Sequence, residues 1–518
     1  MVFKELKATP LQGGRLALGA LILLLVLFYS SSYWNHPERP VASPDHPKAG
    51  WNGGFDQGEY HKSVTALAAN NYSPSEYHYP LGYPLLASLS YGLTQDHPFF
   101  LPDLFCYVVT GVAFFHICGL LLKPWESFVI CFFALVWSTT VTNSFVIPWT
   151  NTPVCAATLT LACIALTGRR DKLALIVGGA CASVIFAVRP GDAIFSWPLL
   201  VPLWLYGGDR REMGKRATYF LMGALPLTTV FTYLSMAIHG NLVSPAYLHA
   251  SALIGFSFAP IGLKLYTLLV DGFPLFAENR TLTNVFPVVL LTLPGIAFFI
   301  KKFGWTGLAV LAAQAGALLY FLAYNDFWVA QLFRYGAVRY WLWLIPFWCF
   351  FAYLSFRFAW REFGWLRTSL MIAIPVLAWT LPELRQRQVG YQLAAGSADS
   401  IPCQPAPDRS CSLSFSLVQP ADFDILSIRG VSSYYLTYAE VYVDQRKTMR
   451  FRDFFTSDGP DGKTLLMFYR RQHGSTFKLV VPTLYGNIQQ FTMSSLEVIQ
   501  LRRGLALHNP LRRYHSHG

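Results

Sequence analysis

The sequence predicts an α-helical polytopic membrane protein with about 11 transmembrane helices, followed by a C-terminal β-sandwich-like soluble domain. Of its 518 residues, 53% are hydrophobic and only 13% are charged, whereas average soluble domains have about 25% charged residues. Long apolar runs alternate with short basic loops up to about residue 382, and short alternating segments follow. A soluble fold could not bury that much apolar surface.

Eleven apolar runs predict the spans, because about 20 helical residues cross a ~30 Å hydrocarbon core. They lie near residues 15–33, 99–122, 126–143, 147–167, 172–188, 191–206, 217–238, 284–301, 305–324, 337–356 and 366–382. The first run lacks a clear A-x-A site after Tyr33 and Trp34, so a retained anchor is expected rather than a cleaved signal peptide.

The positions of Lys and Arg predict the orientation. With the N-terminus inside, every cytoplasmic segment is basic, through Lys4, Lys7, Arg15, Lys123, Arg169, Arg170, Lys172, Arg210, Arg211, Lys215, Arg216, Lys301, Lys302, Arg357, Arg361 and Arg367. The net charge of +12 therefore indicates topology, and no nucleic-acid partner is expected. We expect a multi-pass protein of the cell inner (cytoplasmic) membrane, with a 1–382 transmembrane domain, outer loops 34–98 and 239–283, and residues 383–518 on the periplasmic side.

Residues 383–518 have a different pattern. Alternating segments at 412–417, 439–444 and 476–481 predict short strands, and the sequence Asp458–Gly462 is typical of a hairpin turn rather than a calcium loop. The acids of this domain are scattered, so an accessory or acceptor-binding role is expected.

The nine cysteines fit an envelope protein. Seven lie in apolar spans, where free cysteines act as small hydrophobes. Cys403 and Cys411 lie close enough in sequence for a local disulfide in an oxidising compartment. No C-x-x-C, H-E-x-x-H, P-loop or G-x-G-x-x-G pattern occurs. No motif therefore favours a zinc protease, a nucleotide-driven motor or a dinucleotide-binding enzyme.

Two acids in the first outer loop, Asp56 and Glu59, are the candidate catalytic residues. Carboxylates beside a membrane are costly unless water, a partner or a reaction justifies them. They begin a segment, 56–69, that predicts a short amphipathic helix with Tyr60 and Val64 on one face. The structural alternative is a capping box, with Asp56 as N-cap and Glu59 reaching back to its backbone.

An aromatic, proline-stiffened run follows this helix. Tyr77, His78, Tyr79 and Tyr83, together with Tyr60, are candidate substrate-binding residues, because this run is unlike a free linker and is typical of a surface held against the membrane.

Three arginines at the outer ends of spans are candidate phosphate-binding residues: Arg189, Arg334 and Arg339. A guanidinium grips phosphate bidentately. The alternative is that each simply extends toward lipid headgroups.

A divalent metal ion is a further hypothesis. His78, His239 and His249 are predicted outside with Glu76, and His and Glu from separate loops can bind such an ion. No tight spacing motif supports it, so solvated histidines remain the alternative.

At Asp56, Glu59 and the run from His78 to Pro84, the chain resembles the GT-C superfamily of membrane glycosyltransferases. This group includes protein O-mannosyltransferases and the lipid A aminoarabinose transferase. The resemblance covers roughly residues 10–382, including Arg189–Pro190 and Arg339–Tyr340. It implies a polyprenyl-phosphate-linked sugar donor, a general base matching Asp56 by position, and a loop metal for which Glu76 and His249 are the nearest matches.

The implied reaction is a single displacement that inverts the anomeric carbon. A carboxylate deprotonates the acceptor, which is an outer-face glycan, lipid or protein, and the lipid phosphate leaves as a stable anion held by cations. The alternatives are a flippase or transporter of lipid-linked glycans, or a non-catalytic subunit of an envelope assembly complex. Transport would predict ionisable residues at mid-span, whereas the acids here gather outside.

Overall fold

The computed structural model describes residues 11–40, 50–53, 55–168, 171–205, 210–256, 258, 261–269, 282, 287–324 and 337–380, and in the C-terminal part 391–398, 401–402, 404–405, 411–429, 439–448, 454–458, 463–481, 492–493 and 495–501. The chain forms two compact units, which are described separately. The first contains Met1–Ala250, Val288–Tyr320 and Gly336–Thr368, and the second contains Ser251–Pro287, Phe321–Tyr335 and Ser369–Gly518.

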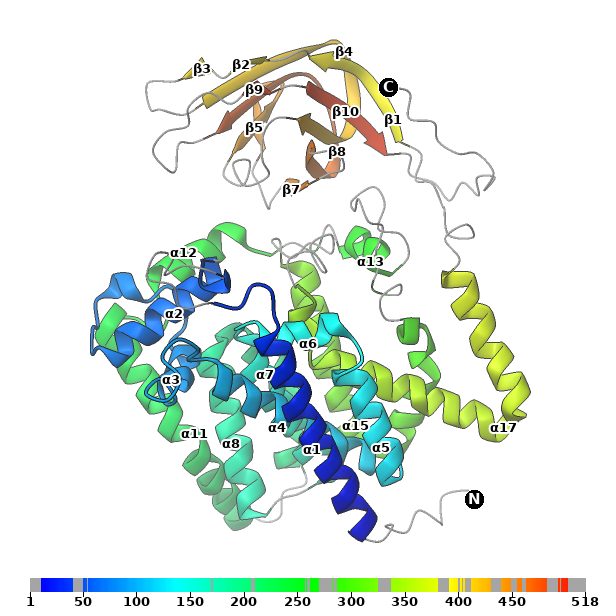
Figure 1. Ribbon diagram of the computed structural model, residues 1–518. Coiled ribbons are helices and arrows are strands. Elements are labelled where there is room, and N and C mark those ends of the chain that lie inside the picture. Colours follow the sequence, from blue (N-terminus) through cyan, green and yellow to red (C-terminus); the bar gives the residue numbers. More distant parts are fainter. Residues whose placement is uncertain are drawn as a thin grey trace. The chain divides into compact units, whose positions relative to one another are not determined.

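Helices make up the described part of the first unit (Figure 1). The second unit also contains α13 and the C-terminal ends of α12, α15 and α17. In chain order the α-helices are α1 (Leu11–Trp34), α2 (Phe55–Ala68), α3 (Gly82–Ser88), α4 (Phe100–Gly119), α5 (Pro124–Leu135), α6 (Thr139–Val146), α7 (Asn151–Thr167), α8 (Lys172–Val188), α9 (Ala193–Ser196), α10 (Val201–Leu205), α11 (Arg210–His239), α12 (Pro245–Ile254), α13 (Ile261–Leu269), α15 (Thr292–Ala323) and α17 (Leu344–Thr380). The 3-10 turns are η1 (Gly50–Gly53), η2 (Pro74–Glu76), η3 (Pro190–Asp192), η4 (Trp197–Leu199), η5 (Pro287–Leu291) and η6 (Ala337–Trp341).

Four of the described helices are long and apolar enough to cross a membrane: Gly13–Trp34, Phe100–Gly119, Arg211–His239 and Val289–Ala323. Shorter apolar helices occur at Pro124–Leu135, Asn151–Thr167 and Lys172–Val188. By the length and composition of these helices, the chain is a helical membrane protein.

Two predicted spans are interrupted. The run 126–143 is divided between α5 and α6, and the run 191–206 becomes η3, α9, η4 and α10. Pro198 and Pro202 explain the second interruption, because proline lacks the N–H that a continuous helix needs and clashes with the preceding turn. Asp192 therefore lies in a turn ahead of short helices rather than in a spanning helix.

Close backbone contact joins α8 and α11. A Cβ at Gly179 would overlap the carbonyl oxygen of Phe220, and a Cβ at Gly223 would overlap that of Ile176. Small residues allow membrane helices to approach in this way. Elsewhere α1 packs on α4 and α5, and α4 packs on α7. This contact with α11 holds α8 in place, and Arg189 is the C-cap residue of α8.

The C-terminal strands are β1 (Tyr391–Ala398), β2 (Ile401–Pro402), β3 (Gln404–Pro405), β4 (Cys411–Arg429), β5 (Glu440–Val443), β6 (Arg446–Thr448), β7 (Phe454–Asp458), β8 (Lys463–Val481), β9 (Thr492–Met493) and β10 (Ser495–Leu501). They form an eight-stranded sheet with the order β1-β10-β4-β8-β5-β6, in which β3 pairs with β4 and β7 with β8, and a separate β2-β9 pair. The pairings are antiparallel.

Alternation of buried and exposed side chains positions this sheet's core. Phe423 of β4 packs edge-on against Phe468 and Phe477 of β8, and Val441 and Val443 of β5 are buried. The alternation that predicted strands is therefore confirmed here. Cys403, one partner of the predicted disulfide, and residues 459–462 of the predicted turn lie outside the described residues. The seven cysteines of the apolar helices are free.

Candidate active site

Asp56 lies in the first turn of α2, which begins one residue before the predicted start. Its Oδ1 accepts a hydrogen bond from the Tyr79 hydroxyl, and its Oδ2 lies 3.5 Å from Nη2 of Arg339. The Asp56 side chain keeps 30% of its surface exposed. Both described partners are side chains, and the capping-box alternative stays a prediction.

Arg339 lies in η6 and is held by aromatic rings. Its guanidinium carbon is 3.3 Å from the ring centre of Trp149, the residue two places before α7. It is also 4.9 Å from the ring centre of Tyr340, and its Nη2 donates to the Tyr340 hydroxyl at 3.3 Å. Cation–π contact favours a guanidinium over an aromatic face. The side chain is only 10% exposed, so its position is well defined.

Arg189 contacts the same tyrosine. Its guanidinium carbon is 4.9 Å from the Tyr340 ring centre, and its Nη2 is 3.4 Å from Oδ1 of Asp192. Arg189 caps the C-terminal end of α8, and Asp192 closes the following η3 turn. Burial raises the pKa of Asp192 to about 6, although the Arg189 charge opposes the rise. Arg339 thus contacts the predicted base, Asp56, and shares Tyr340 with the second predicted cation, Arg189.

A group of phenol rings borders Asp56. The centre of the Tyr60 ring lies 4.9 Å from that of the Tyr79 ring and 5.2 Å from that of the Tyr83 ring. The ring centres of Tyr79 and of Tyr247 in α12 are 5.9 Å apart. Burial, and next the Asp56 charge, raise the pKa of Tyr60 and of Tyr79 far above the usual range. Both phenols therefore stay protonated, and Tyr79 can serve only as a hydrogen-bond donor to the carboxylate.

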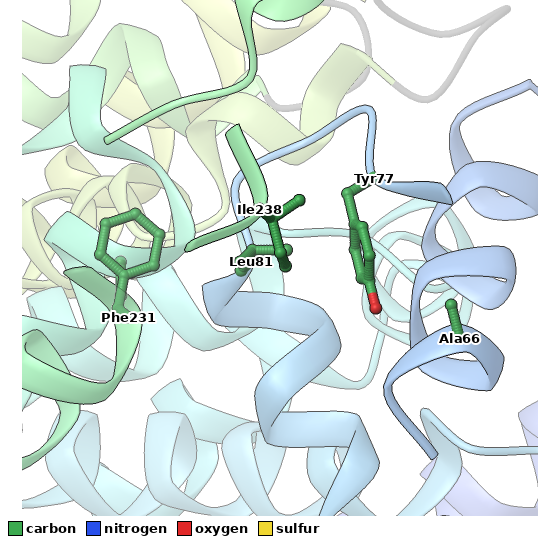
Figure 2. Close-up of a cluster of buried hydrophobic side chains, with 6 residues drawn as sticks. Ala66, Tyr77, Leu81, Phe231 and Ile238 are labelled. Carbon is green, nitrogen blue, oxygen red and sulfur yellow. The ribbon is translucent and has the colours of Figure 1, made fainter. Parts of the chain in front are cut away.

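Two predicted substrate contacts have structural partners. Tyr77 is 1% exposed and belongs to a hydrophobic cluster with Ala66, Leu81, Phe231 and Ile238 (Figure 2). The Tyr83 hydroxyl donates to Oδ2 of Asp103 in α4 at 2.8 Å. Through these contacts, the run after α2 is attached to α4, α8 and α11.

Three predicted residues remain. Glu59 is half-buried on α2 and has no ion pair among the described residues. His78 packs edge-on against Tyr79. Arg334 lies outside the described residues.

The two metal candidates are not brought into one group. Glu76 lies 3.6 Å from Nζ of Lys62, and His249 is exposed on α12. Among the described residues, no group of three or more His, Cys, Asp or Glu side chains is arranged to hold a metal ion. A metal requirement stays a prediction.

Several residues of the site had not been predicted. Asp192, Trp149, Tyr340 and Tyr247 all contact or face the two arginines. The spacing of Arg189 and Asp192, three residues apart, was the one signal in the sequence that could have identified a partner.

Comparisons with family profiles, with curated proteins and with solved structures find no significant match to the chain.

Proposed function

We propose that this protein is an integral-membrane glycosyltransferase of the GT-C type, which transfers a sugar from a polyprenyl-phosphate-linked donor to an outer-face acceptor with inversion. One observation carries the proposal. A loop carboxylate, Asp56, lies 3.5 Å from Arg339, and Arg189 shares Tyr340 with Arg339. A base beside two cations is the minimum that displacement of a lipid phosphate requires.

In this mechanism Asp56 takes the proton of the acceptor hydroxyl as its oxygen attacks the anomeric carbon. A carboxylate offers about four lone-pair sites, so Asp56 retains acceptor capacity beside Tyr79 and Arg339. The bond between the anomeric carbon and the phosphate oxygen breaks, and its electron pair stays on the phosphate. Arg189 and Arg339 stabilise that anion, so no second carboxylic acid is needed to protonate the leaving group.

The proposal also covers the topology of the chain and the role of its C-terminal domain. It includes about eleven crossings, a β-sandwich-like C-terminal domain that binds the acceptor, and a site facing the periplasm of the inner membrane. Basic residues in each predicted inside segment support this orientation. Any divalent ion would be held near Glu76 and His249.

The test is sugar transfer from a panel of radiolabelled polyprenyl-phosphate sugars by purified protein in lipid nanodiscs, with a membrane extract as the source of acceptor. Asp56→Asn is expected to lower the rate by about 10²- to 10⁴-fold, the usual contribution of a general base. Glu59→Gln tests the second candidate base, and the exposed Asp96→Asn is the control expected to stay within a few-fold of wild type.

Equal transfer by wild type and Asp56→Asn would remove Asp56 as the base. Loss with Glu59→Gln alone would transfer the role to Glu59. Absence of labelled product with intact donor binding would favour the flippase or assembly-subunit alternatives.

A further inference from the structure

Among the residues that the structure describes, four charged groups lie in this cluster, two of each sign. Arg189 and Arg339 carry two positive charges, and Asp56 and Asp192 carry two negative charges when ionised. A donor phosphodiester adds a third negative charge. Unbalanced charge is costly where water is excluded. Entry of the phosphodiester is therefore favoured only if one carboxylate leaves its guanidinium partner or becomes protonated.

Asp192 is the carboxylate placed to do so. Its side chain is 6% exposed, against 30% for Asp56, and it contacts Arg189 from the next turn of the same segment. Asp56 has to remain ionised to act as base, whereas Asp192 has no part in the displacement. A desolvated ion pair gives little net stability compared with apolar packing, so stability alone does not account for an acid at this position.

Within the described part of the chain, the groups that face Asp192 and Arg189 come from several elements. Arg189 faces it from the end of α8, and Tyr320 of α15 interacts with both. Tyr340 of η6 and Tyr247 of α12 face Arg189. The three tyrosines are phenols that stay neutral near pH 7. Asp192 is therefore the group of this cluster whose charge can change near neutral pH, as its pKa of about 6 indicates.

We infer that Asp192 is an internal anion that occupies Arg189 until the donor phosphate replaces it, and that Asp192 takes up a proton from solvent when the phosphate binds. The inference rests on the proposed function of this site. It makes donor binding pH-dependent. Above about pH 6 ionised Asp192 competes for Arg189, and below it protonated Asp192 leaves the guanidinium to the phosphate.

The experiment measures binding of polyprenyl methyl phosphate to the full-length protein in nanodiscs between pH 5.5 and 7.5. This diester keeps one negative charge throughout, so the ligand does not titrate. For wild type, the Kd is expected to rise about ten- to thirtyfold across this range, as full linkage to one group with a pKa near 6 requires. Asp192→Asn is expected to bind at pH 7.5 about as tightly as wild type at pH 5.5, with little pH dependence. Asp96→Asn should behave as wild type.

Wild-type binding that does not change with pH, or an Asp192→Asn variant that binds no more tightly than wild type at pH 7.5, overturns the inference while leaving the donor site in place. A purely structural Asp192 would give that second result together with a lower unfolding temperature. If the variant is not recovered folded, the wild-type pH series decides by itself. No binding by wild type or by Asp192→Asn at any pH overturns the donor site and the inference with it.

Discussion

At the scale of single residues, Arg339 shows how a cation is kept in place beside a membrane. It is 3.3 Å from the Trp149 ring centre, within hydrogen-bonding distance of Tyr340 and 3.5 Å from Asp56. A guanidinium with one carboxylate partner would retain freedom about its long side chain, whereas the indole face restricts it to one plane. Under the proposed function, Trp149 would therefore be a positioning residue for the cation that holds the donor phosphate.

Removing that face should weaken donor binding. Cation–π contacts contribute about 0.5–2 kcal/mol, so Trp149→Ala is expected to raise the Kd for polyprenyl methyl phosphate by about two- to thirtyfold. Trp149→Phe should retain most of the affinity. Trp125→Ala, at an indole of α5 that is 54% exposed, is the control. Unchanged binding by Trp149→Ala would contradict this role.

The sequence predicted part of this site. The cost of a carboxylate beside a membrane makes Asp56 a candidate, and the fit of guanidinium to phosphate makes Arg189 and Arg339 candidates. In the structure Arg339 contacts Asp56 and shares Tyr340 with Arg189. Trp149 and Asp192 were missed. Tryptophan near a span end is ordinary in membrane proteins, and residue order alone carries no information about which ring lies over which cation.

At the scale of elements, periodicity predicted the helices well and their interruptions poorly. The helix predicted at 56–69 is α2, Phe55–Ala68, with Tyr60 and Val64 buried as expected. The run 191–206 is as apolar as a span, but its prolines divide it because each removes a backbone hydrogen bond from a helix. A membrane helix tolerates that loss only where neighbouring helices satisfy the freed backbone groups. Hydropathy does not measure that compensation.

The glycine contact between α8 and α11 provides an element-scale test. In Gly223→Ala the new Cβ would overlap the Ile176 carbonyl oxygen, and backbone cannot move aside as a flexible side chain can. Overpacking of this kind costs about 1–3 kcal/mol, so the variant should unfold at a lower temperature in detergent and bind polyprenyl methyl phosphate less well, because α8 carries Arg189.

Gly214→Ala on the same helix is the matched control, because its Cβ would meet nothing within 4 Å. Alanine favours a helix interior over glycine by about 0.5–1 kcal/mol, so this variant should be as stable as wild type or slightly more stable. Equal behaviour of the two variants would mean that the α8–α11 contact does not limit stability.

At the scale of the whole molecule, the number of crossings decides which side each domain occupies. The described parts of two predicted spans, 284–301 and 305–324, fall largely in η5 and α15, and those of two more, 337–356 and 366–382, fall largely in η6 and α17. Gly304 has a φ of 54° and Gly364 a φ of 74°, and the left-handed region interrupts a helix. Each helix therefore has a break at which the chain can turn back.

Labelling of introduced cysteines tests this arrangement. If α15 turns at Gly304, the adjacent Lys302 lies inside, while Asn241 after α11 and His473 of the sheet both lie outside. Asn241→Cys and His473→Cys should then react with an impermeant maleimide in sealed right-side-out vesicles, and Lys302→Cys only after permeabilisation. Cys403 and Cys411 are changed to serine in all variants, and this background without an introduced cysteine is the blank.

The outcomes separate the topologies because each crossing exchanges the sides. Reaction of Lys302→Cys in sealed vesicles would mean that the segment before Gly304 does not cross the membrane, and no reaction even after permeabilisation would mean that α15 crosses without turning at Gly304. Protection of His473→Cys while Asn241→Cys reacts would mean an odd number of crossings between the two positions. The C-terminal strands would then lie in the cytoplasm, on the opposite side from Asp56, and could not present an acceptor to it. Reaction at both outer positions and protection at Lys302 would leave the sheet and the carboxylate on the same side, as acceptor binding by this domain requires.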